Sequence, residues 1–486
     1  MATILDGKEV SKHNTKNDCW IVIANRVYDV TKFLADHPGG RGVILKYAGK
    51  DATKAYLEVH TPETAEQLLP PSSFKGIVDV ETLVSIAPDD NRDKAQNASK
   101  LLHISLCINV DDFTPAAMPK LSKAAAAYLS SGADTLTSLK NNLRDWQKIT
   151  FRPRVLRNVL TVSTTNTMLG CKTACPFFIA PTGLMGIINP EAESPLVQGA
   201  VRSGIHYCIS GVSTKPHKDM MALFKAEKQR LVDPLSDPTL FFQLYVNSKK
   251  EKTVQLIKNA KELGFRALMI TVDTPVVGKR EDASRHRAQE ELEGGFEEYD
   301  ATPAGSEDQP VRPGSDPGGA LSKTLGWEDL KWMKELFGGP IVLKGIQCAE
   351  DAKMAVDMGV DGIYLSNHGG RQLDYSPSSL RTLLEIRMVY PEVFQKCEIY
   401  VDGGVRRGTD VVKALCLGAT AVGIGRPLIY AMAAYGTQGV LKAVEILKTE
   451  VEVTMRLIGA TSVKDLHSRL VNTAELERKI MSRSML

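Results

Sequence analysis

The chain has 486 residues and a formal net charge of +3, from 60 Lys and Arg against 57 Asp and Glu. With 43% hydrophobic and 24% charged residues, its composition excludes a collagen, a largely disordered chain and a disulfide scaffold. The small charge excess excludes nucleic acid or an anionic membrane as the general partner, so any anion site must be local. The length suits three average domains, or one small domain beside one large barrel.

The eight cysteines are scattered through apolar or helical contexts, and we interpret them as reduced thiols. No apolar run approaches the about 20 residues of a membrane-spanning helix. The first residues, MATILDGKEVSKHN, have neither the apolar region of a signal peptide nor the Arg- and Ser-rich pattern of a transit peptide. The sequence thus predicts no membrane span and shows no presequence.

Residues 1–80 contain their own turns, short strands and helices, which predicts a first domain. His37 stands at an H-P-G-G turn, and His60 follows within the same domain. Two imidazoles can bind a haem iron from opposite faces, and an iron filled at both axial positions carries electrons rather than activating a ligand. The alternative is that both histidines are ordinary surface residues.

Periodicity is lost after residue 80, in VETLVSIAPDDNRDKAQNASK, which is rich in Asp, Asn, Lys and Ala. This composition predicts a linker over 81–105. Such a linker would let the two flanking domains move relative to each other.

Residues 106–486 alternate short apolar runs with amphipathic helical segments such as 249–265 and 349–360. Eight such repeats predict an α/β fold, a closed (β/α)8 TIM barrel preceded by the small α+β domain. No G-x-G-x-x-G follows a strand, which argues against a dinucleotide fold. The eight expected strands lie at 176–182, 206–211, 240–246, 267–273, 340–345, 362–367, 398–404 and 421–426.

Residues 281–320 interrupt this rhythm, with little apolar periodicity and eleven acidic residues against three arginines. A loop of this length is usually either a lid or a disordered segment, and both interpretations stay open.

Polar residues recur at the carboxyl ends of the expected strands, where barrel active sites are built. Packing alone would explain one or two of them but not a set on all eight strands. Those ahead of strand seven are Thr182, Gly183, Ser210, Gln243, Tyr245, Thr271, Asp273, Lys344, Asn367 and His368.

The last two strands end in DGGVRRG (402–408) and GIGRP (423–427). Glycines there expose backbone N–H groups and arginines add positive charge, which favours a phosphate of a cofactor. The segment SNHGGRQLD (366–374) places His368 and Arg371 just after strand six. Histidine can act as a general base, and a guanidinium can pair bidentately with a carboxylate.

Two family resemblances cover most of the chain. Residues 8–80 resemble cytochrome b5 domains through Trp20, the Val27–Val30 strand, HPGG, AGKDAT and LEVH, which implies a b-type haem held by His37 and His60. Residues 105–470 resemble the FMN-dependent 2-hydroxy acid dehydrogenases and oxidases. The motifs are SNHGGRQLDY, VDGGVRRGTDVVKALCLGA, FFQLYV, ITVDTPVVGKRE and YLSSGAD.

The resemblance implies roles at the substrate. His368 would be the base, with Asp273 as its charge partner when the ring is an imidazolium. Arg371 and Tyr128 would bind the substrate carboxylate, and Tyr245 would hydrogen-bond the hydroxyl group being oxidised.

The resemblance also implies an FMN site. Arg280 would be a second cation near the substrate, and Lys344 would lie beside the flavin pyrimidine edge and stabilise the reduced, anionic flavin. The other expected contacts to the flavin ring are Ala180, Pro181, Thr182, Gly183, Ser210, Gln243 and Thr271. The expected contacts to the ribityl phosphate end are Asp402, Gly403, Gly404, Val405, Arg406, Gly425 and Arg426.

Gly183 and Val212 are expected against the substrate side chain, and both are smaller than in lactate-selective relatives. Removing apolar groups from a pocket wall shifts selectivity by about 1–3 kcal/mol. We therefore hypothesise that the pocket accepts 2-hydroxy acids larger than lactate, including mandelate. Leu129 replaces an aromatic residue common in relatives, with no evident effect.

The resemblance implies oxidation of an L-2-hydroxy acid to the 2-oxo acid at FMN, with electrons passing through the haem to cytochrome c. It also implies a homotetramer in the mitochondrial intermembrane space, with the cytoplasm as the alternative location. One rival function is an oxidase that uses oxygen, with a vestigial haem domain. Another is a haem-binding electron carrier fused to an inactive barrel.

Overall fold

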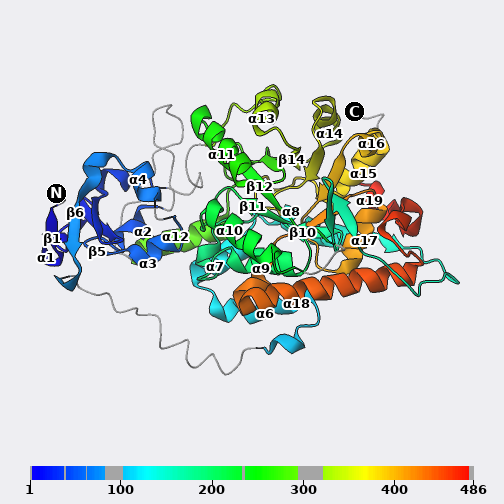
Figure 1. Cartoon of the computed structure of the whole chain (residues 1–486), viewed down its shortest axis with the longest axis horizontal. Helices are drawn as coiled ribbons and strands as arrows, with labels where there is room; N and C mark the ends of the chain where they lie inside the picture. The colour runs from blue at the N-terminus through cyan, green and yellow to red at the C-terminus, as the bar shows by residue number, and fades with distance from the viewer. Residues whose placement is uncertain are drawn as a thin grey trace.

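The computed structural model describes residues 3–37, 40–61, 63–82, 102–231, 236–293 and 321–480. The chain folds into a small N-terminal domain and a larger barrel domain, which lie side by side in Figure 1. Most of the expected linker, 83–101, and the acidic segment 294–320 fall outside the described residues.

The N-terminal domain is built around a mixed sheet with the order β1-β6-β4-β3-β2, and β5 pairs with β3. The β3–β4 hairpin turns at Ala24 and Asn25, both at positive φ, as a tight hairpin turn requires. The strands are β1 (Ile4–Asp6), β2 (Asn14–Thr15), β3 (Asp18–Ile23), β4 (Arg26–Asp29), β5 (Lys50–Asp51) and β6 (Phe74–Asp79). The α-helices are α1 (Gly7–Val10), α2 (Arg41–Leu45), α3 (Thr53–Leu57) and α4 (Thr64–Leu68).

Eight parallel strands close the barrel, and the sequence prediction of this fold is confirmed. Closure is made where β10 pairs with β17, with Phe178 opposite Gly423. The strands are β10 (Phe177–Ile179), β11 (Tyr207–Ser210), β12 (Leu240–Tyr245), β13 (Leu268–Thr271), β14 (Ile341–Ile346), β15 (Gly362–Leu365), β16 (Glu398–Val401) and β17 (Ala421–Ile424).

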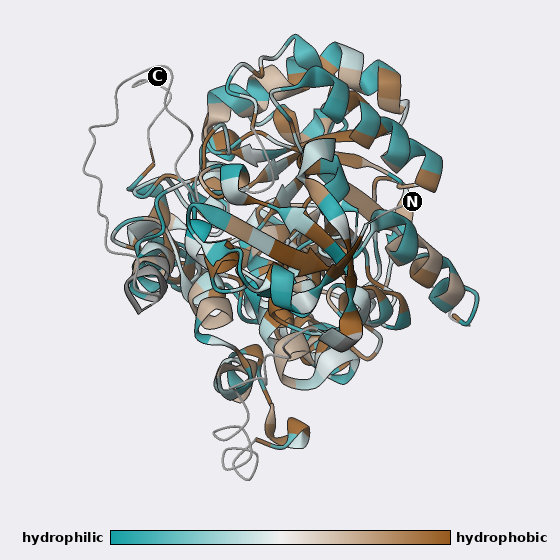
Figure 2. Ribbon diagram, turned by 90° about the vertical axis from the view of Figure 1, so that its left-hand side faces the viewer, coloured by the Kyte–Doolittle hydropathy of each residue, from teal (hydrophilic) through white to brown (hydrophobic). Residues whose placement is uncertain are grey.

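Side chains alternate between the barrel interior and the helical layer, as strands buried on both faces demand. The interior is filled by a cluster that includes Phe178, Phe241, Met269, Tyr364 and Tyr400. In Figure 2 the strands are largely brown, for apolar, whereas the surrounding helices show much teal. The barrel is therefore a packed core, and chemistry is confined to its ends.

The helical layer follows the strands in alternation. Its longest helix, α18 (Arg426–Ile458), contains a kink at Tyr435 and Gly436, where the backbone leaves helical geometry. The other helices are α9 (Ser194–Arg202), α10 (His217–Lys228), α11 (Lys250–Leu263), α12 (Glu281–Glu293), α13 (Asp329–Phe337), α14 (Ala349–Asp357), α15 (Ser379–Val389), α16 (Val393–Lys396) and α17 (Gly408–Cys416).

Further elements surround the barrel. They are α6 (Phe113–Ala117), α7 (Lys123–Ser130), α8 (Thr137–Gln147), β7 (Thr150–Phe151), β8 (Asn166–Met168), β9 (Cys171–Thr173), β18 (Val471–Asn472) and α19 (Ala474–Glu477). The 3-10 helices are η1 (Thr31–Phe33), η2 (Pro71–Ser73), η3 (Val80–Thr82), η5 (Ile104–Leu106), η6 (Val110–Asp112), η7 (Met118–Lys120), η8 (Met185–Ile187), η9 (Val463–Asp465) and η10 (Ser468–Leu470).

The structure differs from the sequence prediction at the start of the acidic segment. Residues 281–293 form α12 rather than irregular chain, and Arg285 pairs with Glu281 one turn earlier at 2.5 Å. Such i,i+4 pairs stabilise a helix that has no apolar stripe, which is why hydrophobic periodicity did not reveal it.

The eight cysteines are free thiols, as predicted. Within the described part of the chain, no helix is both long and apolar enough to cross a membrane.

Candidate active site and haem site

Asp273 and His368 come together at the carboxyl ends of β13 and β15. His368 Nδ1 lies 3.0 Å from Asp273 Oδ1, and His368 Nε2 lies 3.2 Å from the Tyr245 hydroxyl oxygen. With the Asp273 carboxylate accepting the Nδ1 proton, Nε2 carries the lone pair of the neutral ring. His368 therefore contacts both its expected charge partner Asp273 and Tyr245, the residue expected at the substrate hydroxyl.

The turn after β15 aims the His368 ring. His368, Gly369 and Gly370 all have positive φ, a conformation that an ordinary side chain rarely adopts. A Cβ atom on Gly370 would lie 2.6 Å from the Leu139 backbone nitrogen on α8, so only glycine fits this turn. The Ser366 hydroxyl accepts a hydrogen bond from the His368 backbone N–H at 3.0 Å.

Opposite charges fix the protonation of the pair. Burial opposes ionisation of Asp273, but the charges of His368 and Lys344 outweigh it and bring the pKa of Asp273 to about 2. Burial lowers the pKa of His368, and Asp273 partly restores it while Lys344 lowers it further. The site therefore holds a carboxylate beside a neutral imidazole near pH 7, which is the arrangement of a general base.

Gly345 makes room for Asp273. Its φ is +110°, and a Cβ atom there would lie 2.6 Å from Asp273 Cβ. The Thr274 hydroxyl donates to Asp273 Oδ1 at 2.7 Å, the same oxygen that His368 approaches, and this bond helps to hold the carboxylate in place.

Arg371 and Arg280 lie beside this pair. Arg371 Nη1 donates to the Tyr128 carbonyl at 2.6 Å, and its guanidinium lies 4.8 Å above the Tyr128 ring. Arg280 Nε donates to the Arg371 carbonyl at 3.4 Å. Burial and the charge of Arg371 lower the pKa of Arg280 to about 10. Two cations in one partly dehydrated mouth favour an anion such as a carboxylate.

Buried polar side chains cross the mouth on adjacent strands. The Ser210 hydroxyl donates to Gln243 Oε1 at 3.1 Å, and Gln243 Nε2 donates to the Thr271 hydroxyl at 2.9 Å. Lys344, which is 4% exposed, donates to the Ser366 hydroxyl at 3.1 Å. This row of donors and acceptors, ending on a buried ammonium group, fits the polar edge of a flavin ring.

The buried carboxylate of Asp402 supports the same assignment. Asp402 Oδ1 is buried and has no hydrogen bond of standard geometry among the described residues. The Tyr364 hydroxyl lies close enough to interact with this carboxylate, and burial, with a contribution from Asp402, raises the Tyr364 pKa. A carboxylate can accept further hydrogen bonds, so a hydroxyl of a ribityl chain could also donate to it. The residues present therefore fit FMN.

Glycine geometry shapes the expected phosphate end. Gly403 and Gly404 have φ of +89° and +76°, and a Cβ atom on Gly404 would lie 2.0 Å from the Asn142 carbonyl oxygen on α8. Gly425 is the N-cap of the long helix α18, whose N-terminal N–H groups and dipole favour an anion. The expected neighbours Ala180, Pro181, Thr182 and Gly183 follow β10, and Val405 follows Gly404.

The two phosphate-end arginines have protein partners in the structure. Arg406 pairs with Asp111 at 3.3 Å. Arg426 donates to the carbonyls of Leu129, Ser131 and Gly369. Burial and the charge of Arg371 lower the pKa of Arg426 to about 9. Their role in binding the phosphate stays a prediction.

Gly183 and Val212, which are expected from the sequence to lie against the substrate side chain, are packed against each other. A Cβ atom on Gly183 would lie 2.6 Å from Val212 Cγ2, so valine occupies part of the space that glycine leaves. The Tyr128 hydroxyl donates to the Gly183 carbonyl at 3.1 Å. A change at either residue would therefore alter the packing of the other.

In the N-terminal domain, the centroids of the His37 and His60 rings lie 6.0 Å apart, with the ring planes inclined at 63° in an edge-type arrangement. An iron between the rings would form two metal–nitrogen bonds of about 2 Å. These bonds, together with the distance from each ligating nitrogen to its ring centroid, add up to roughly the observed centroid separation. His37 Nδ1 lies 3.0 Å from the Gly40 carbonyl, the kind of bond that orients a ligating histidine. Burial and the charge of His37 bring the pKa of His60 to about 4, so His60 is neutral and able to ligate. The pair fits a haem iron.

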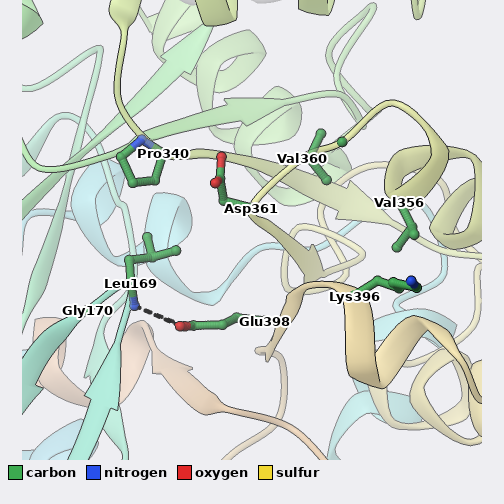
Figure 3. Close-up of a pocket in the computed structure, with 9 residues that line it drawn as sticks. Leu169, Gly170, Pro340, Val356, Val360, Asp361, Lys396 and Glu398 are labelled. Carbon is green, nitrogen blue, oxygen red and sulfur yellow. Dashed lines mark hydrogen bonds between the residues drawn. The ribbon is translucent and has the colours of Figure 1, made fainter.

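A pocket of about 450 Å³ lies at the opposite end of the barrel, before the first residues of β14, β15 and β16. Figure 3 shows Glu398 accepting a hydrogen bond from the Leu169 backbone N–H, and Asp361 accepts one from the Ile341 N–H. These carboxylates serve the fold, and none of the expected site residues is in this pocket.

Sequence reasoning missed several supporting residues. Ser366 joins Lys344 to the His368 turn, Thr274 fixes Asp273, and Ser131 accepts from Arg371. Ser366, Thr274 and Ser131 lie within the motifs SNHGGRQLDY, ITVDTPVVGKRE and YLSSGAD, so membership of these motifs was the available signal. Ser131 lies far from Arg371 in sequence, and only the fold brings them together.

These features define a class: an oxidoreductase with a flavin-binding barrel and a two-histidine haem domain. The model for FMN-dependent dehydrogenases matches residues 117–473, and that for the cytochrome b5-like haem/steroid-binding domain matches residues 6–79. The chain belongs to the FMN-dependent dehydrogenase family and carries an N-terminal cytochrome b5-like domain. FMN and haem are its cofactors.

Known proteins share this architecture. The chain is 37% identical over 481 residues to an L-lactate dehydrogenase (cytochrome) of Wickerhamomyces anomalus, covering 97% of this chain and 80% of the relative. It is 36% identical to a peroxisomal (S)-2-hydroxyacid oxidase of Arabidopsis thaliana, covering 75% and 96%. A double mutant of flavocytochrome b2 with pyruvate bound superposes with a TM-score of 0.71 at 34% identity, covering 82% and 94%.

Replacing His60 should remove haem but not FMN. We expect His60→Ala to lose the absorption of a six-coordinate haem, because the iron loses an axial ligand, while the flavin spectrum is retained. His13→Phe is the matched control, since His13 lies in the same domain, stacked on Trp20 at 3.6 Å. Intact haem absorption in His60→Ala would contradict the ligand assignment.

Proposed function

We propose that the protein oxidises an L-2-hydroxy acid to the 2-oxo acid at FMN and passes the electrons through haem b to cytochrome c. The observation that carries the proposal is the His368–Asp273 pair, which faces two arginines in the mouth of a flavin barrel. A base beside cations suits a substrate that has a hydroxyl group next to a carboxylate.

The substrate carboxylate pairs with the guanidinium of Arg371 and with the Tyr128 hydroxyl. This places the 2-hydroxyl group near the Tyr245 hydroxyl and His368 Nε2. His368 accepts a substrate proton at Nε2, and Asp273, 3.0 Å from Nδ1, stabilises the resulting imidazolium. A positioned base of this kind contributes about 10²–10⁴-fold to a rate.

FMN supplies the acceptor for the electron pair leaving carbon 2, and the haem passes electrons on one at a time. Lys344 places a buried positive charge at the flavin end of the mouth, donating to Ser366. His37 and His60 would hold the haem iron from both sides, which would favour electron transfer over oxygen binding. An oxidase that uses oxygen is the alternative.

His368→Gln should abolish flavin reduction by substrate while FMN and haem stay bound, because glutamine cannot accept the proton. Exposed His103→Gln is the control and should reduce flavin at the normal rate. The measurement is anaerobic stopped-flow absorbance, and normal turnover of His368→Gln would remove the assigned base.

Asp273→Asn should also change the pH profile. In the native site flavin reduction falls at acid pH, as pH drops through a His368 pKa that burial has lowered below 6.5. Loss of Asp273 lowers that pKa further, so the acid limb moves to lower pH, and the plateau rate falls by about a hundredfold or more. Exposed Asp282→Asn on α12 is the control. An acid limb that moves to higher pH would contradict the pairing.

The pocket beside Gly183 supports a substrate larger than lactate. We expect kcat/KM for lactate and (S)-mandelate to lie within a hundredfold of each other. Val212→Ala should shift the ratio further toward mandelate, by about 1–3 kcal/mol of transition-state binding, because it removes the methyl groups that fill the space over Gly183. A hundredfold or greater preference for lactate would contradict this proposal.

We further infer a homotetramer. The segment 152–161 exposes Val155, Leu156 and Leu160 at 80%, 101% and 83%, an apolar arm suited to a second copy of this chain. Light scattering should give four times the chain mass, and Leu156→Asp should lower the measured mass. A native monomer would contradict the inference.

We place the protein in the mitochondrial intermembrane space by kinship with the L-lactate dehydrogenases (cytochrome), which cell fractionation would test.

A further inference from the structure

Gly186 lies in η8, three residues after Gly183, at a point where the two domains touch. Its φ is not in the positive range, so the backbone itself does not require glycine. A Cβ atom there would lie 2.0 Å from the Glu58 carbonyl oxygen of the haem domain and 2.6 Å from Thr214 Cγ2 of the barrel. Space, not backbone conformation, selects glycine at this position.

Glu58 is the C-cap of α3 and precedes the haem ligand His60 by two residues. The His60 backbone N–H donates to the Tyr56 carbonyl at 2.8 Å, so His60 is held to the end of this helix. Carbonyls at a helix C-terminus carry partial negative charge and point along the axis. The contact with Gly186 therefore sets the distance between the haem ligand His60 and the barrel loop that also carries Gly183.

Helix α12 makes a second contact between the two domains, because it packs against α2 of the haem domain and against α7 of the barrel. Figure 1 shows α12 between the two domains. Helix α2 follows Gly40, the partner of His37, and α7 carries Tyr128. Both haem-ligand segments thus rest on elements next to the substrate site.

The barrel side of the Gly186 contact is braced. The Gly186 backbone N–H donates to the Thr214 hydroxyl at 3.0 Å. The Glu193 carboxylate, 0% exposed, accepts from the backbone N–H groups of Thr214 and Lys215 at 2.8 and 2.9 Å. A side chain at 186 would therefore displace the haem domain more readily than the loop.

We propose that Gly186 is the barrel residue on which the haem domain docks. Because glycine has no side chain, the C-terminal end of α3 can approach the loop that carries Gly183 and Gly186 closely enough for electron transfer from flavin to haem. This inference rests on the proposed function. A haem held by His37 and His60 would supply one-electron transfer, so the two electrons of the substrate would leave the flavin singly and pass to the proposed cytochrome c acceptor.

The test compares Gly186→Ala, Gly186→Ala/Thr214→Ser and Thr214→Ser. The serine keeps the hydroxyl that accepts from residue 186 but removes Cγ2, so the double variant relieves the clash inside the barrel and keeps the clash with Glu58. Stopped-flow absorbance with an L-2-hydroxy acid should show native flavin reduction in the double variant. Haem reduction should slow about tenfold or more, which corresponds to a loss of about 1.4 kcal/mol of docking free energy. Thr214→Ser alone should behave as native.

Hydrogen exchange supplies a readout independent of turnover. Backbone amides of 53–60 and 183–188 should exchange faster in the double variant than in Thr214→Ser, with the haem spectrum unchanged. Native haem reduction and native exchange in the double variant would overturn the docking role of Gly186. Failure of the native enzyme to reduce its own haem would instead overturn the proposed function, and the exchange comparison would still decide the docking contact.

Discussion

The hydrogen bond between the Asp273 carboxylate and the His368 ring is the interaction on which the active site depends. It places a negative charge where burial alone would favour a neutral acid, and the nearby cations keep that charge in place. Its geometry depends on two glycine positions, Gly345 beside the carboxylate and Gly370 in the turn that carries the histidine. A strand end and a left-handed turn therefore combine to present one nitrogen atom, Nε2, to the substrate.

The same pair balances a concentration of positive charge. Lys344, Arg280, Arg371 and Arg426 lie at one end of the barrel, although the whole chain has a net charge of only +3. Bringing cations together without water is unfavourable unless anions join them, and a carboxylate and a phosphate satisfy that requirement. The haem domain contacts this end of the barrel at Gly186 and at α12, so its haem-ligand segments lie near the expected substrate and flavin residues.

The sequence predicted the features that local pattern encodes. All eight barrel strands were found because each is a buried apolar run, and His368, Asp273 and Tyr245 were found because each follows a strand end. Helix α12 was missed because ion pairs, not an apolar stripe, stabilise it. The contact between Gly186 and Glu58 could not be read at all, since it joins two domains across 128 positions and involves a backbone carbonyl. The expected domain limits of 80 and 105 stay predictions.

The most direct test of the account is an absorption spectrum of the purified protein, taken anaerobically before and after an L-2-hydroxy acid and then after cytochrome c. The account predicts that the flavin band bleaches, the reduced haem bands follow, and cytochrome c then becomes reduced as the haem reoxidises. A flavin that bleaches while the haem stays oxidised, with electrons passing only to oxygen once air is admitted, would contradict it.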